Sequence, residues 1–240
     1  MITRGRFLTA AVATAATAAG PATALGADEV PSLLDHIILG CSDLDTGIAF
    51  VERSTGVRAA YGGVHPGGGT RNALVALGGK RYLEILAPDP SQTNLRSGAV
   101  RDVAALRALA SPKLLGWAVH PGNIEAFVAQ LRQRGIAIEG PVSGSRKRPD
   151  GTILKWKTAH LVDDDHGMLP FFIDWDGSVH PSTDAPKGCI VERFVIDTPD
   201  PETLRKTIQR IGIDVPTYRK AVLELSTIIV GPQGRLEATS

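Results

Sequence analysis

Short apolar runs and amphipathic stretches alternate along the chain in an order that occurs twice. Residues 33–39 form an apolar run suited to a buried strand, and a helix with one apolar face follows and ends at Gly56. A glycine-rich segment occupies residues 62–70. Residues 72–77 and 81–86 then have the pattern of two strands joined by a Gly-Gly turn. This half of the chain predicts a strand, a helix, a loop or strand, and two more strands.

The second half repeats that order. Residues 114–120 predict a strand, and Asn123 is a suitable N-cap for the amphipathic helix that follows. Residues 140–151 are again rich in glycine and proline, and we expect a turn there. Residues 152–161 and 169–175 predict the last two strands. The chain therefore predicts two β-α-β-β-β modules in an α+β fold.

A third, partial unit is predicted at the C-terminal end. Residues 189–196 indicate a strand, and Asp200-Pro201 is a typical helix start. Residues 222–230 and 235–238 indicate a hairpin. We expect this β-α-β-β unit to cover an open edge of the sheet.

Residues 1–27 have the three parts of an export signal. Arg4 and Arg6 form a basic start, an uncharged Ala/Thr-rich stretch follows, and small residues precede position 27. The start resembles a twin-arginine signal, but Gly5 separates the arginines, so the twin-arginine and general secretory routes both stay open. We expect a periplasmic or secreted protein with no stable membrane span in the mature chain. An uncleaved N-terminus is the alternative.

Composition and charge exclude several classes of protein. Hydrophobic residues make up 43% of the chain, which excludes a disordered polymer. The formal net charge of +1 lacks the basic excess of a general nucleic-acid binder, so no nucleic-acid partner is expected. Only Cys41 and Cys189 are present, which excludes a thiolate zinc site and leaves both a disulfide and two free thiols open. No Gly-x-Ser-x-Gly elbow supports acyl hydrolysis.

Four sequence motifs, together with the two modules, resemble the vicinal oxygen chelate superfamily, and within it the glyoxalase-like domain family. The motifs are Leu34-Asp35-His36-Ile37-Ile38, Gly62-Gly63-x-His65-Pro66-Gly-x-Gly69-Thr70-x-Asn72-x-Leu74, Tyr82-Leu83-Glu84-Ile85 and Leu169-Pro170-Phe171-Phe172-Ile173-x-Trp175.

The resemblance implies two modules whose curved sheets form a cup. It places a glyoxalase-like domain at residues 28–188, with modules at about 33–90 and 114–178, and leaves residues 189–240 as a C-terminal extension. In metalloenzymes of the superfamily, metal ligands come from the first and last strands of each module.

His36 and Glu84 occupy these two ligand positions in the first module. An imidazole and a carboxylate suit zinc, iron, manganese or nickel, and Glu84 is also a candidate catalytic base. The second module departs from the pattern, because apolar residues, among them Phe172, align with the ligand positions. The candidates for a third ligand are Asp174, His65, His160 and His166. The alternative to a metal site is that His36 is a buried core histidine and Glu84 a hydrogen-bonded carboxylate.

The glycine-rich segment supplies a second group of candidate residues. His65, Thr70 and Asn72 bring a titratable ring, a hydroxyl and an amide together, and we expect them to contact a substrate. A structural turn is the alternative. The run Arg146-Lys147-Arg148 is interpreted as a solvated turn that could flank an acidic ligand.

The preferred function is a metal-assisted lyase, isomerase or epimerase that acts on a small molecule with vicinal oxygens. The rival is a metal-free protein of the same fold that binds or sequesters a small molecule. A third interpretation is that the apolar faces form the interface of a homodimer and not a ligand cup.

Overall fold

A computed structural model describes residues 29–148, 150–164 and 167–240. The predicted export signal at residues 1–27 and the candidate ligand His166 lie outside the described residues. The fold is α+β, as predicted, and is built on one eight-stranded sheet and one four-stranded sheet.

The first module has the predicted order of elements. Asp43 caps its helix through a 2.9 Å hydrogen bond from the Thr46 amide, and Gly56 ends the helix in a left-handed conformation that favours glycine. The elements are β1 (Leu34–Gly40), α1 (Leu44–Thr55), β2 (Ala60–His65), β3 (Thr70–Ala76) and β4 (Tyr82–Pro88).

The second module repeats the arrangement, and α2 (Ala99–Arg107) connects the two. Asn123 caps the helix of this module, as predicted, by accepting a hydrogen bond from the Ala126 amide. The elements are β5 (Lys113–Val119), α3 (Ile124–Gln133), β6 (Ile138–Lys147), β7 (Ile153–Leu161) and β8 (Phe171–Asp174).

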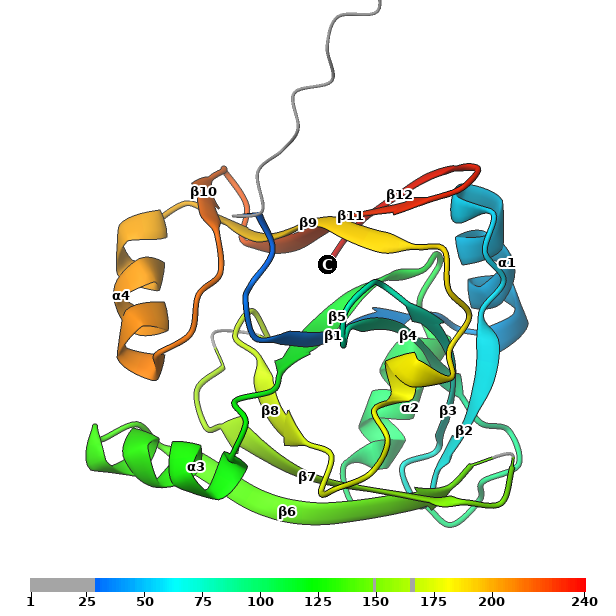
Figure 1. Cartoon of the computed structure of the whole chain (residues 1–240), viewed down its shortest axis with the longest axis horizontal. Coiled ribbons are helices and arrows are strands. Elements are labelled where there is room, and N and C mark those ends of the chain that lie inside the picture. The colour runs from blue at the N-terminus through cyan, green and yellow to red at the C-terminus, as the bar shows by residue number, and fades with distance from the viewer. Residues whose placement is uncertain (1–28, 149, 165–166) are drawn as a thin grey trace, which may run out of the picture.

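The two modules form one curved sheet. Its strand order is β2-β3-β4-β1-β5-β8-β7-β6, and the two first strands, β1 and β5, pair antiparallel at its centre. Each first strand also pairs parallel with the last strand of its own module. The sheet curls so far that its end strands, β2 and β6, contact each other (Figure 1). This curvature produces the predicted cup.

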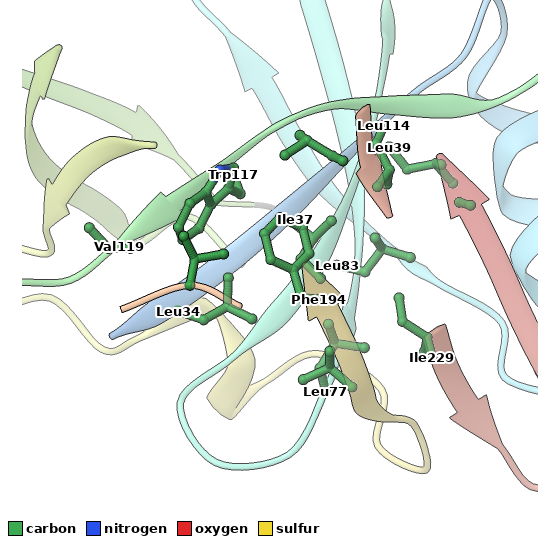
Figure 2. Packing of buried hydrophobic residues seen from close by; sticks show 14 of the residues in the cluster. Leu34, Ile37, Leu39, Leu77, Leu83, Leu114, Trp117, Val119, Phe194 and Ile229 are labelled. Carbon is green, nitrogen blue, oxygen red and sulfur yellow. The ribbon is translucent and has the colours of Figure 1, made fainter. Parts of the chain in front are cut away.

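The C-terminal unit forms a smaller sheet with the order β10-β9-β11-β12. Its Phe194 and Ile229 pack in one core with Ile37 and Trp117 of the large sheet (Figure 2). The unit therefore covers the convex face of the large sheet rather than an open edge. Its elements are β9 (Ile190–Thr198), α4 (Pro201–Ile211), β10 (Thr217–Arg219), β11 (Glu224–Gly231) and β12 (Gly234–Thr239), and a short 3-10 helix (Pro181–Thr183) precedes them.

The two glycine-rich segments at residues 62–70 and 140–151 form strands over part of their length. Strand β2 runs through Gly62 and Gly63, and strand β6 runs through most of residues 140–151. Cys41 and Cys189 are both buried free thiols. In the described part of the chain, no helix is both long and apolar enough to cross a membrane.

Candidate functional site

A cavity of about 240 Å³ lies within the curve of the large sheet. Polar and aromatic side chains from both modules line it. The polar and aromatic lining residues are His36, His65, Asn72, Tyr82, Glu84, Arg146, Trp156, Phe171 and Trp175.

Strand alternation explains which side chains reach the cavity. On β1, His36 and Ile38 line it, whereas Ile37 and Leu39 pack in the core on the other face. On β4, Glu84 faces the cavity between core residues. The first and last strands of the first module therefore direct the two predicted metal ligands into one space.

His36 is held from behind by Asp35. Its Nδ1 atom lies 2.7 Å from Asp35 Oδ1, and the imidazole stacks on Tyr82 with ring centroids 4.6 Å apart. A register irregularity in the β1–β5 pairing, between Leu34 and His36, lets these neighbouring side chains meet. The carboxylate favours the tautomer with hydrogen on Nδ1, so the Nε2 lone pair faces the cavity.

Asp35 is a buried carboxylate with three side-chain partners. Its Oδ2 atom accepts a hydrogen bond from Trp175 Nε1 at 2.9 Å and lies 3.1 Å from His180 Nε2. Burial by itself would raise the pKa of Asp35, but the contacts with His180 and His36 outweigh it and hold the pKa well below its usual range. Asp35 therefore stays charged and fixes the His36 ring.

Glu84 lies at the point where the other polar groups converge. Asn72 Nδ2 donates a 2.6 Å hydrogen bond to Oε1, and His65 Nε2 lies 3.6 Å from the same oxygen. The second oxygen, Oε2, is 3.8 Å from His36 Nε2. Glu84 is 7% exposed and His36 2%. The structure thus brings together an imidazole and an acid that are far apart in the chain.

The three predicted substrate contacts divide into two kinds. His65 and Asn72 line the cavity, whereas Thr70 is outside its lining and meets His65 Nδ1 at 2.9 Å. Burial lowers the pKa of His65, the Glu84 carboxylate opposes this, and the positive Arg146 adds to it. The Oδ1 atom of Asn72 is buried without a hydrogen-bond partner. His65 and Asn72 are therefore placed to contact a ligand, and Thr70 to orient His65.

Arg146 is the main site residue that the sequence did not place here. We interpreted its basic run as a solvated turn, but Arg146 lies on β6, is 6% exposed and lines the cavity. Its guanidinium donates a hydrogen bond to the Gly62 carbonyl oxygen of β2. Trp156 of β7 also lines the cavity, as part of its aromatic wall.

Two other candidate third ligands that the structure describes, His160 and Asp174, are not at the cavity. His160 lies at a separate, smaller cavity, and Asp174 is outside the lining of both. Phe172 packs in the core against Phe127 of α3, so Asp174, two residues along, shares the face of Phe172 and not that of Phe171. Across residues 29–148, 150–164 and 167–240, no group of three or more His, Cys, Asp or Glu side chains has the arrangement of a metal site.

Comparison with family models adds to this picture. A model described as a glyoxalase-like domain matches residues 34–212, which includes β9 and α4 of the C-terminal unit. The chain therefore belongs to the glyoxalase-like domain family. A comparison with curated proteins finds no match.

Several solved structures are similar to this chain, and the first of them shares its fold. A hypothetical protein from Staphylococcus aureus is 17% identical with a TM-score of 0.58, and the match covers 86% of this chain and 84% of that one. Methylmalonyl-CoA epimerase from Mycobacterium tuberculosis is 21% identical with a TM-score of 0.43, over 65% of this chain and 92% of the epimerase. Methylmalonyl-CoA epimerase from Streptomyces coelicolor is 23% identical with a TM-score of 0.43, over 60% and 97%.

Proposed function

We propose that the cavity is the active site of a metal-assisted lyase, isomerase or epimerase acting on a small molecule with vicinal oxygens. The observation that carries the proposal is the approach of His36 Nε2 to Glu84 Oε2, 3.8 Å apart inside the cavity. This separation is longer than a hydrogen bond. The nitrogen and the oxygen that would bind the metal therefore face each other with no hydrogen bond between them.

The donor set fits part of a divalent metal site. An imidazole nitrogen and a carboxylate suit zinc, iron, manganese or nickel. The contact from Asp35 to His36 Nδ1 is the kind of support that metal-bound histidines have in other proteins. His36 and Glu84 would hold the ion, and such an ion supplies positive charge that stabilises negative charge on substrate oxygens.

The chain itself would supply the proton transfer. Asn72 holds Glu84 Oε1 at 2.6 Å, so Oε2 is the oxygen that would either hold the ion or, once detached from it, accept a proton from a carbon next to a substrate carbonyl. His65 and Asn72 would position the substrate. The wall of Trp156, Phe171 and Trp175 would exclude water from the reacting atoms.

Metal analysis of the purified protein tests this proposal. We expect about one metal ion per chain in the wild type, as in other single-ion sites. His36→Ala should lose the ion, and His160→Ala, which lies at the separate cavity, should keep it. Full metal content in His36→Ala, or none in the wild type after growth with each of the four metals, would contradict it.

A metal-free binding protein is the second candidate function. The observation that favours it is the apolar character of the second module, whose Leu154, Phe171 and Ile173 line the cavity without a donor atom for a metal. A binder should keep its ligand affinity in a chelator. An enzyme that needs metal should lose turnover there and regain it when one of the four metals is restored.

A further inference from the structure

Arg146 is a buried cation without an ion-pair partner among the described residues, and Glu84 of the same cavity acts on it only from beyond ion-pair distance. It is 6% exposed, and its guanidinium donates a hydrogen bond to the neutral carbonyl oxygen of Gly62. No carboxylate among the described residues lies within ion-pair distance of it. The nearby Arg148 differs, because its guanidinium pairs with Asp184 at 2.6 Å. A buried charge is costly unless an opposite charge compensates it, so Arg146 has the character of a ligand-binding group.

The position of Arg146 supports this interpretation. It lines both the main cavity and an adjoining cavity of about 210 Å³. Gly63 of β2 makes room for it, because a Cβ atom there would lie 2.5 Å from Arg146 Nη1. The backbone of β2 is therefore shaped around the guanidinium.

The rest of the cavity limits what an anionic ligand can be. Glu84 contributes the negative charge of the cavity and Arg146 the positive one, so a ligand anion is attracted to the Arg146 side. The wall near them is aromatic, with Trp156, Phe171 and Trp175. A planar carboxylate suits the fork of donors on a guanidinium.

We propose that Arg146 binds a carboxylate of the substrate, so that the substrate is a 2-oxo or 2-hydroxy acid with an apolar, preferably aromatic, side group. This inference rests on the proposed function for the choice of vicinal oxygens, and on Arg146 alone for the negative charge. The carboxylate pairs with Arg146, the neighbouring oxygen lies toward His36 and Glu84, and the side group packs on the aromatic wall.

Calorimetric titration with two matched probes tests the proposal. The probes are 3-phenyllactate and 3-phenylpropane-1,2-diol, which share the ring and the vicinal oxygens but differ in the carboxylate. In the wild type we expect phenyllactate to bind at least about tenfold more tightly than the diol, because a charge-assisted pair forms only with the acid.

Three variants assign that difference to Arg146. Arg146→Gln should weaken phenyllactate binding at least about tenfold and leave the diol unchanged. Arg146→Lys, which keeps the charge if the glutamine variant does not fold, should fall between them. The control Arg148→Gln should stay within about twofold of the wild type, since Arg148 already pairs with Asp184 and does not line the main cavity.

The outcomes separate this inference from the proposed function. Equal binding of acid and diol by the wild type, unchanged binding in Arg146→Gln, or no saturation by phenyllactate at about 10 mM overturns the anion site. Titrations run in chelator test Arg146 alone. If the purified wild type holds no metal but Arg146→Gln still weakens phenyllactate binding, the anion site is supported and the metal-assisted function is contradicted.

Discussion

Asp35 is the residue on which the geometry of His36 depends. It joins His36, His180 and Trp175 through one buried carboxylate. The Ser182 amide donates to His180 Nδ1, which leaves Nε2–H of that ring to donate to Asp35. Each of these contacts fixes a ring whose position would otherwise be free to change.

Asp35→Asn is expected to weaken both the fold and the site. The substitution removes the charge that these donors meet, and we expect a loss of about 2–4 kcal/mol in the free energy of unfolding. Urea unfolding measures this. Asp184→Asn is the control, because the Asp184 side chain is 64% exposed and its substitution should change stability by less than about 1 kcal/mol. A similar loss in both variants would show that the Asp35 network has no special weight.

Single residues also show where sequence interpretation succeeds and where it stops. His36 and Glu84 could be assigned to one site, because the resemblance to the superfamily places metal ligands on the first and last strands of a module. Arg146 could not, because its burial depends on the approach of β2 and on the space at Gly63, more than eighty residues earlier. In the sequence, the local charge and the nearby Pro-Asp-Gly are as typical of a solvated turn as of a strand that buries one arginine.

At the scale of elements, the packing of the two sheets holds the convex side of the cup in place. Phe194 of β9 is fully buried, and its ring lies 5.0 Å from that of Trp117 on β5 (Figure 2). Because β5 and β1 pair along their length, this contact supports the strand that carries His36.

Phe194→Ala is expected to cost about 3–5 kcal/mol of unfolding free energy, since it leaves a cavity in a packed core. Ile190→Ala on the same strand is the matched control, because Ile190 is 56% exposed and should have little effect. Chemical denaturation of both variants makes the comparison. If the two losses are equal, β9 is not part of the main core.

The limits of the elements were also only partly predictable. The helix cap Asn123 is a local signal and marks the correct helix start. The strands β2 and β6 were harder to recognise, because glycine and proline within them favour a turn. They are strands because pairing with β3 and β7 satisfies their backbone groups.

At the scale of the whole molecule, we propose that residues 1–27 direct export. We expect the mature protein from its native host to lack these residues and to occur in the periplasm or the medium. Intact-mass measurement and cell fractionation check this, with a chain lacking residues 1–27 as the cytosolic control. An exported chain that retains Met1 would support the uncleaved alternative. The homodimer stays a prediction, which light scattering can test.

The sequence by itself determined the order of elements and the repeat of two modules, because these follow from short-range periodicity and caps, and its motifs placed His36 and Glu84 at one site through the family resemblance. Only the tertiary structure decided that the two side chains approach to 3.8 Å, that β9–β12 cover the convex face, and that Arg146 is buried in the cup. The reason is that curvature and sheet-on-sheet packing bring together residues whose separation in the chain leaves no local signal.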